Sequence, residues 1–304
     1  MRLLAVHAHP DDEASKGAAT MARYVAEGHQ VRVVTCTGGE RGDILNPRLA
    51  VTPELVADMP AVRRAEMAEA AAILGVEHVW LGFVDSGLPE GDPLPPLPEG
   101  SFAVQPFEVT VPALADQIRA FRPHVLLTYN ERGGYPHPDH IMTHEVSIRA
   151  VREAAGSSLP GEPWAVQKVY YDVSFSRARL ETVHAALIAR GEESPYEAWL
   201  ERRDPAFERT ATARIHVADY FDQRDAALRA HATQIDPEGF FFHLPRDLER
   251  EIWPVEEFEL ARSLVPTAPL EDDLFAGVVD DDAGVLDEDA AGDGPLSGHA
   301  TPGA

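Results

Sequence analysis

Cysteine is almost absent from this 304-residue chain, in which Cys36 is the single example. An internal disulfide is therefore excluded, and such sparse cysteine fits a protein of a reducing cytoplasm. Cys36 falls within residues 30–37, which read as a buried strand. We interpret it as a packed thiol and not as a reactive one.

Basic residues are also scarce, because 26 Lys and Arg face 51 Asp and Glu and give a formal net charge of -25. This balance argues against a nucleic acid or an anionic membrane as partner. Part of this negative charge is concentrated near the C-terminus, since no Lys or Arg occurs from residue 263 onward. The same stretch holds ten acidic residues, which are Glu271, Asp272, Asp273, Asp280, Asp281, Asp282, Asp287, Glu288, Asp289 and Asp293. We predict a folded domain over residues 1–277 and a disordered acidic tail over residues 278–304.

Long apolar runs are missing as well. No stretch approaches the ~20 apolar residues that a membrane-spanning helix needs. The N-terminus, with Arg2 and one short apolar run, does not read as a signal peptide. The sequence predicts a soluble, cytoplasmic protein and leaves the oligomeric state open.

The chain does contain a regular alternation of short apolar runs and helical patterns. Strands are predicted at residues 2–8, 30–37, 78–83 and 124–129, and helices at 15–27, 61–74, 108–121 and 139–155. Because no tight hairpins separate them, they indicate an α/β fold with a Rossmann-like, doubly wound and mostly parallel sheet. The second half is a less regular α+β part, with strands expected at 167–175 and 212–221 and helices at 177–190, 195–202 and 222–234.

The first predicted strand ends in a cluster of polar residues, His9-Pro10-Asp11-Asp12-Glu13. Open α/β sheets bind ligands in the crevice beyond the carboxyl ends of their strands, so this position favours a functional site. The alternative is a loop in which the aspartates cap the following helix. Glu13 itself fits a supporting or capping carboxylate better than a ligand.

A second cluster follows the fourth predicted strand, with His137, Asp139 and His140 in the run Gly133 to His140, and His144 one helical turn later. On its own this pattern also fits surface histidines. In a right-handed sheet both loops open on the same edge, so residues about 130 apart are expected to meet. Histidine and carboxylate ligands without cysteine favour zinc with an open coordination position. The residues alone do not choose between His140 and His144.

The two loops together resemble the LmbE-like, or PIG-L, superfamily of zinc-dependent N-deacetylases. Further segments, at residues 37–42, 81–87 and 228–236, are similar to the superfamily members that hydrolyse mycothiol S-conjugates. The resemblance covers roughly residues 1–277. It implies a zinc-dependent deacetylase or amidase domain, a small-molecule substrate, and one Zn²⁺ per chain with Fe²⁺ as an alternative.

The resemblance also implies a role for each residue of the loops. His9, Asp12 and His140 are expected to hold the metal, and Asp11 to act as the base for the attacking water. His137 is expected to stabilise the oxyanion. Asp139 is expected to orient His137, and the hydroxyl of Tyr135 is expected to act on the same oxyanion.

Substrate contacts are predicted at Lys16, Arg63 and Asp85. Lysine at position 16 resembles the amidases, whereas the related deacetylases have a small polar residue there. Arg63 and Asp85 match positions that hold sugar or inositol hydroxyls in those deacetylases. The alternative for Lys16 is a solvated lysine on a helix. The alternative for Arg63 is a solvated arginine that forms salt bridges on a helix face.

The resemblance therefore implies hydrolysis of the amide bond of mycothiol S-conjugates for detoxification, releasing a mercapturic acid and glucosaminyl-inositol. Deacetylation of N-acetylglucosaminyl-inositol is the alternative, and recruitment to natural-product biosynthesis is another within the superfamily. Two readings from other classes are a non-catalytic zinc-binding protein and a nucleotide-binding module. The latter is disfavoured because no Gly-x-Gly-x-x-Gly follows the first strand.

Overall fold

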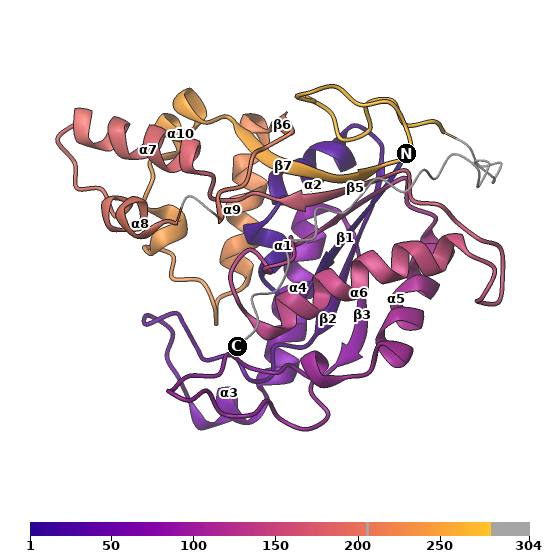
Figure 1. Ribbon diagram of the computed structural model, residues 1–304. Coiled ribbons are helices and arrows are strands. Elements are labelled where there is room, and N and C mark those ends of the chain that lie inside the picture. The colour runs from indigo at the N-terminus through magenta and orange to yellow at the C-terminus, as the bar shows by residue number, and fades with distance from the viewer. Residues whose placement is uncertain (205–206, 281–304) are drawn as a thin grey trace.

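The computed structural model describes residues 1–204 and 207–280 and places one seven-stranded sheet at their centre (Figure 1). The strands in sequence order are β1 (Arg2–His7), β2 (Gln30–Thr37), β3 (Glu77–Phe83), β4 (Val125–Thr128), β5 (Lys168–Asp172), β6 (Ala213–His216) and β7 (Val255–Ser263). Their order across the sheet is β3-β2-β1-β4-β5-β7-β6. The five strands from β3 to β5 in this order pair in parallel, which confirms the predicted mostly parallel α/β sheet.

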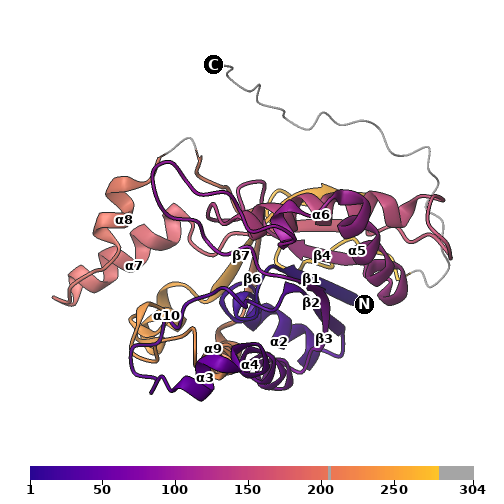
Figure 2. The ribbon, with the colours of Figure 1, turned by 90° about the horizontal axis from the view of Figure 1, so that it is seen from below.

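Helices cover both faces of this sheet, as Figure 2 shows. The helices are α1 (Asp12–Ser15), α2 (Ala18–Ala26), α3 (Pro53–Ala57), α4 (Met59–Leu74), α5 (Phe107–Phe121), α6 (Pro138–Ala155), α7 (Arg177–Ala189), α8 (Glu197–Arg202), α9 (Phe221–Ala230) and α10 (Arg246–Ile252). One core lies under α2, α4 and α9, and the second lies under α5 and α6. A third, smaller cluster joins α7 to α10 beside the sheet.

Cys36 belongs to the core under α5 and α6, where it is fully buried. Burial raises the pKa of its thiol to about 12. The interpretation of Cys36 as a packed and unreactive thiol agrees with both observations.

The helix predicted over residues 15–27 is wrong at its start, because the helical conformation is interrupted between α1 and α2. Lys16 is extended there, and Gly17 has a φ of 78°, which glycine adopts at little cost. Three other predictions are too long: the strand expected over 167–175 ends at Asp172, the strand expected over 212–221 ends at His216, and the helix expected over 222–234 ends at Ala230. In each case a short 3₁₀ turn or loop continues the chain.

The strand β7 was not predicted, because its glutamates hide the alternation of its apolar residues. Two of these glutamates have partners within the fold: Glu256 accepts hydrogen bonds from Thr20, and Glu257 pairs with Arg214. Strand β7 runs antiparallel between β5 and β6. It therefore attaches the irregular second half of the chain to the parallel sheet.

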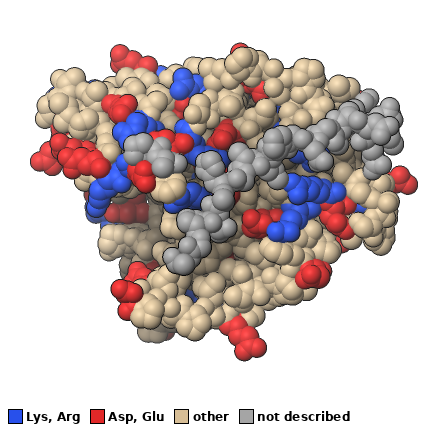
Figure 3. Space-filling view, viewed as in Figure 1, with Lys and Arg blue, Asp and Glu red and all other residues tan. Residues whose placement is uncertain are grey.

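Three further findings bear on the predicted organisation. None of the helices within the described ranges is long and apolar enough to cross a membrane. On the face in Figure 3, the described acidic and basic side chains are interspersed and form no continuous basic surface. The predicted tail lies, from residue 281 onward, outside the described residues.

Candidate metal and active site

The two polar loops meet because β1 and β4 are neighbours in the sheet. Strand order reverses at this pair, so a crevice opens beyond the carboxyl ends of both strands. His9 follows β1 and Asp139 follows β4, and His9 Nε2 lies 3.2 Å from Asp139 Oδ2. The predicted approach of residues about 130 apart is confirmed.

One group of potential metal ligands consists of His9, Asp12 and His140, all buried, with ligand atoms within 4.8 Å of one another. His140 Nδ1 lies 2.9 Å from the carbonyl oxygen of Gly133 and donates its proton there, which leaves the Nε2 lone pair free. That Nε2 atom is buried without a hydrogen-bond partner in the described structure and lies 3.4 Å from Asp12 Oδ2. An unpartnered buried nitrogen facing a carboxylate fits a metal ligand.

Gly133 has a second role beside His140. Its φ is 72°, and a Cβ atom at this position would come 2.6 Å from the Cβ of His140. On the other side, the ring of Tyr129 stacks on the imidazole with centroids 4.3 Å apart. The imidazole of His140 is therefore held between a glycine loop and an aromatic ring.

A second group of potential ligands shares His9 and adds His137 and Asp139. The Asp139 carboxylate accepts a hydrogen bond from the backbone of Ser86 and faces His9, and within the described residues it has no hydrogen bond to His137. His137 is oriented instead by the backbone N–H of Asp139, which donates to its Nδ1 atom over 3.1 Å. His137 is therefore also the N-terminal cap of α6.

Several carboxylates surround His9. Its Nε2 atom lies 3.5 Å from Asp85 as well as close to Asp139, and its Nδ1 atom lies 3.6 Å from Asp12. Burial works against the charged imidazole, but these carboxylates raise the pKa of His9 well above its usual value. A site with this much negative charge favours a cation.

Asp11 occupies a strained position in the loop, with a φ of 118° that non-glycine residues rarely adopt. Its side chain is 23% exposed and lies 3.7 Å from the guanidinium of Arg63. Burial raises the pKa of Asp11 to about 6, and Arg63 opposes that rise. The carboxylate therefore borders the metal ligands and is reachable from the crevice.

His231 joins the site although the sequence analysis did not single it out. Its Nε2 atom lies 2.6 Å from Glu13 Oε1, and both side chains are fully buried. Glu13 Oε2 accepts the backbone N–H of Asp11 over 3.0 Å. The predicted supporting role of Glu13 agrees with this geometry, and a histidine within the family-like segment 228–236 was the available signal.

Lys16 is neither solvated nor at the start of a helix. Its Nζ atom lies 2.6 Å from Asp12 Oδ1, so it pairs with a candidate metal ligand. Burial alone would lower the pKa of Lys16, but Asp12 raises it above the usual value. Lys16 also lines the large cavity described below, where a substrate can reach it.

Arg63 is 2% exposed, so the alternative of a solvated salt bridge does not apply. Its Nη2 atom donates to the carbonyl oxygen of Pro10 over 2.6 Å, which fixes the metal loop. Asp85 is also buried and accepts hydrogen bonds from the backbone of Gly87 and Arg41. Both residues lie beside the site, since Arg63 contacts the loop of Asp11 and Asp85 faces His9.

Tyr135 and His144 make different contacts near His140. Tyr135 is 46% exposed, and its ring centroid lies 4.6 Å from that of His140. His144 Nδ1 contacts the carbonyl oxygen of Tyr129, and His144 belongs to neither group of potential ligands. The geometry therefore favours His140 over His144 as the third ligand.

A cavity of about 540 Å³ opens next to this cluster. Lys16, Asn130 and Tyr135 line its inner end. Phe175, Trp199, Phe207 and Phe241 form an aromatic part of its outer wall, and polar or charged residues such as Ser174, Arg203 and Glu208 line the rest. The volume falls in the range typical of small-molecule sites.

Comparison with known proteins identifies close relatives of this chain. Residues 4–151 match the PIG-L family, the GlcNAc-PI de-N-acetylases. The mycothiol S-conjugate amidase of Streptomyces coelicolor is 57% identical over 92% of this chain and 98% of the relative. The 1D-myo-inositol 2-acetamido-2-deoxy-alpha-D-glucopyranoside deacetylase of Geodermatophilus obscurus is 41% identical over 91% of this chain and 98% of the relative.

Solved structures share the fold at lower identity. A conserved protein of Thermus thermophilus superposes with a TM-score of 0.57 at 24% identity, covering 87% of this chain and 96% of the other. The N,N'-diacetylchitobiose deacetylase of Pyrococcus horikoshii superposes with a TM-score of 0.59 at 17% identity, covering 85% and 83%.

Proposed function

Because the chain belongs to the PIG-L family of de-N-acetylases, we propose that it is a zinc-dependent amidase that cleaves the amide bond of mycothiol S-conjugates. Membership confirms the resemblance drawn from the two polar loops and makes the chain a hydrolase of amide bonds. The products would be an N-acetylcysteine S-conjugate, which is a mercapturic acid, and glucosaminyl-inositol, so the role is detoxification.

One observation carries the choice of substrate. The Streptomyces coelicolor amidase is 57% identical along nearly its whole length, whereas the Geodermatophilus obscurus deacetylase is 41% identical over a similar span. Deacetylation of N-acetylglucosaminyl-inositol is the second candidate, because the same site chemistry serves a smaller acyl group. Several further relatives at 38–40% identity also carry the deacetylase name.

We assign the metal to His9, Asp12 and His140, supported by the free Nε2 atom of His140 and the excess of carboxylates. Zinc at such a site supplies Lewis acidity, which makes a water molecule easier to deprotonate near neutral pH and polarises a carbonyl group. Three protein ligands leave a coordination position open for substrate. Fe²⁺ is the alternative metal, and activity of protein loaded separately with each ion distinguishes them.

Asp11 is proposed to take the proton of the attacking water on its carboxylate oxygen. The water oxygen adds to the scissile carbonyl carbon, the C–N bond then breaks, and Asp11 returns the proton to the leaving nitrogen. Support comes from its partial exposure beside Asp12 and from the contact that Glu13 makes with its backbone.

His137 is proposed to stabilise the oxyanion. Because its Nδ1 atom accepts a hydrogen bond, the neutral ring carries its proton on Nε2. Burial lowers the pKa of His137 to about 4, so the ring is neutral at pH 7 and donates from Nε2 to the developing negative charge. Tyr135, whose pKa burial raises, remains protonated and offers a second donor.

The three predicted substrate residues differ in their support. Lys16 lines the cavity and is the most direct candidate. We propose that Arg63 acts mainly by holding Asp11 and the carbonyl of Pro10, and that Asp85 forms the edge of the site beside His9.

The decisive experiment compares kcat/KM for the bimane adduct of mycothiol with that for N-acetylglucosaminyl-inositol. A higher value for the adduct supports the amidase, and a higher value for the acetylated sugar establishes the deacetylase instead. Loss of activity with a chelator and recovery with zinc would exclude a non-catalytic protein.

A further inference from the structure

The 540 Å³ cavity is larger than the reaction alone requires. An acetyl group adds one methyl to the scissile carbonyl, and this small group leaves most of such a space unfilled. The cavity begins at Lys16, which touches Asp12, and at Tyr135, which packs against His140. Arg63 and Asp85 do not line it. A substrate at the metal site therefore has one neighbouring space that the predicted sugar-binding residues do not share.

The far wall of this cavity presents aromatic rings. Trp199 is 39% exposed and stacks on Phe240 with centroids 4.9 Å apart, and its ring also lies 5.8 Å from that of Phe175. Phe207 is 51% exposed, and the guanidinium of Arg132 lies over its ring, 3.4 Å from the centroid. Exposed aromatic rings that gather around one cavity favour an apolar or aromatic ligand.

Arginines at the rim do not make the cavity an anion site. Arg203 pairs with Glu208, and Arg209 pairs with both Glu131 and Glu259. Acidic neighbours thus neutralise Arg203 and Arg209, and the guanidinium of Arg132, which also lines the cavity, lies over the ring of Phe207.

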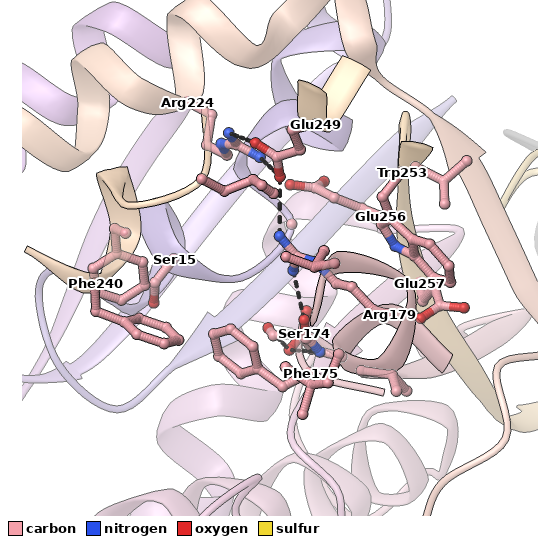
Figure 4. Close-up of a pocket in the computed structure, with 18 of the residues that line it drawn as sticks. Ser15, Ser174, Phe175, Arg179, Arg224, Phe240, Glu249, Trp253, Glu256 and Glu257 are labelled. Atoms are coloured by element: carbon pink, nitrogen blue, oxygen red, sulfur yellow. Dashed lines mark hydrogen bonds and ion pairs between the residues drawn. The ribbon is translucent and has the colours of Figure 1, made fainter. Parts of the chain in front are cut away.

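An ionic cluster holds the segment next to Phe175, one of the rings of this wall. Arg179 donates to the carbonyl oxygen of Ser174 and lies 3.0 Å from Glu249, which also pairs with Arg224 and Arg246. Figure 4 shows this connection running from Ser174, next to Phe175, through Arg179 to Glu249. The segment that contains Phe175 is thus connected to α7, α9 and α10.

From these observations we infer that the cavity binds the apolar group carried on the sulfur of the conjugate, and that Trp199 and Phe207 set the preference for bulky conjugates. This inference rests on the proposed amidase function. The polar sugar and inositol lie on the other side of the scissile bond, whereas the acyl side carries the sulfur substituent. An aromatic cavity next to the site suits the acyl side.

The test compares the S-benzyl and S-methyl conjugates of mycothiol as substrates of the metal-loaded enzyme. The wild type should prefer the benzyl conjugate, and Trp199→Ala and Phe207→Ala should each lower the benzyl-to-methyl ratio of kcat/KM by about tenfold, as expected for lost burial of an aromatic ring. Calorimetric binding of S-benzyl-N-acetylcysteine, compared with the S-methyl compound, should weaken in parallel.

Ile188→Ala is the matched control, because Ile188 is exposed on α7 and does not line the cavity. Its ratio should equal that of the wild type. The inference is overturned if the wild type has no preference for the benzyl conjugate or if both aromatic variants keep it. If the wild type cleaves the acetylated sugar and neither conjugate, the proposed function itself has failed, and this pattern differs from the previous ones.

Discussion

His231 Nε2 lies 2.6 Å from Glu13 Oε1 across 218 residues of sequence, and neither side chain is exposed. Burial would lower the pKa of His231 and raise that of Glu13, but each partner reverses the effect on the other. Since Glu13 also accepts the backbone N–H of Asp11, the end of α9 is connected to the proposed base.

We predict that His231→Ala lowers kcat by about ten- to a hundredfold, the usual cost of losing a supporting contact near a metal site. KM should change little, because His231 lines neither the cavity nor its wall. His231→Gln retains a donor toward Glu13 and should recover part of the activity. Steady-state kinetics of both variants measure this, and equal losses in the two would argue against the proposed connection.

Asp11→Asn should lower kcat by about 10²- to 10⁴-fold, because an amide cannot accept the proton of the attacking water. Bound zinc, measured by elemental analysis, should remain at the wild-type level, since the three proposed ligands are intact. Asp116→Asn, at an exposed position on α5, serves as the control and should have wild-type kinetics. An Asp11→Asn enzyme with full activity would reject Asp11 as the base.

His140 and His144 provide a matched pair on α6. His140→Ala removes a proposed ligand and should weaken zinc binding by at least about a hundredfold, with loss of activity. His144→Ala should keep one zinc per chain, because His144 contacts the backbone of Tyr129 instead. Zinc titration of the chelator-treated variants tests both expectations, and the reverse order of affinities would make His144 the ligand.

Glu249→Gln should destabilise the fold by about 3 kcal/mol at neutral pH, because it leaves the buried arginine cluster without its shared carboxylate. Burial alone would raise the pKa of Glu249, but Arg224, Arg179 and Arg246 hold it below its usual value of 4.5. The contribution of a carboxylate with a lowered pKa is complete above pH 4.5 and is lost as the pH falls through the folded-state pKa. The difference between wild type and variant should therefore shrink in acid.

Urea unfolding at pH 7 and at pH 3.5 measures this difference. Glu145→Gln is the control, because Glu145 pairs with Arg149 on an exposed face of α6. Its effect should stay below about 1 kcal/mol. A Glu249→Gln effect that does not depend on pH would contradict the assigned pKa direction.

Local patterns predicted much of this protein. The run 30–37 gives β2 with no error at either end, and the two polar loops meet because parallel strands share one edge. Relations between distant residues were not predictable in the same way. Nothing around Arg63 indicates that its guanidinium lies buried against Pro10, and nothing near Glu13 indicates His231. Such partners are selected by tertiary packing, which leaves no periodic signal in one sequence.

Strand β7 also bears on the order in which the molecule is made. Among the described strands β6 has β7 as its neighbour in the sheet, yet residues 213–216 leave the ribosome well before residues 255–263. Until β7 arrives, the edge of β5 is unpaired and β6 has no neighbour to join. Unpaired strand edges promote association between chains. Among the described residues β7 is the last strand along the chain, so the edge of β5 is covered only after the rest of the sheet has been synthesised.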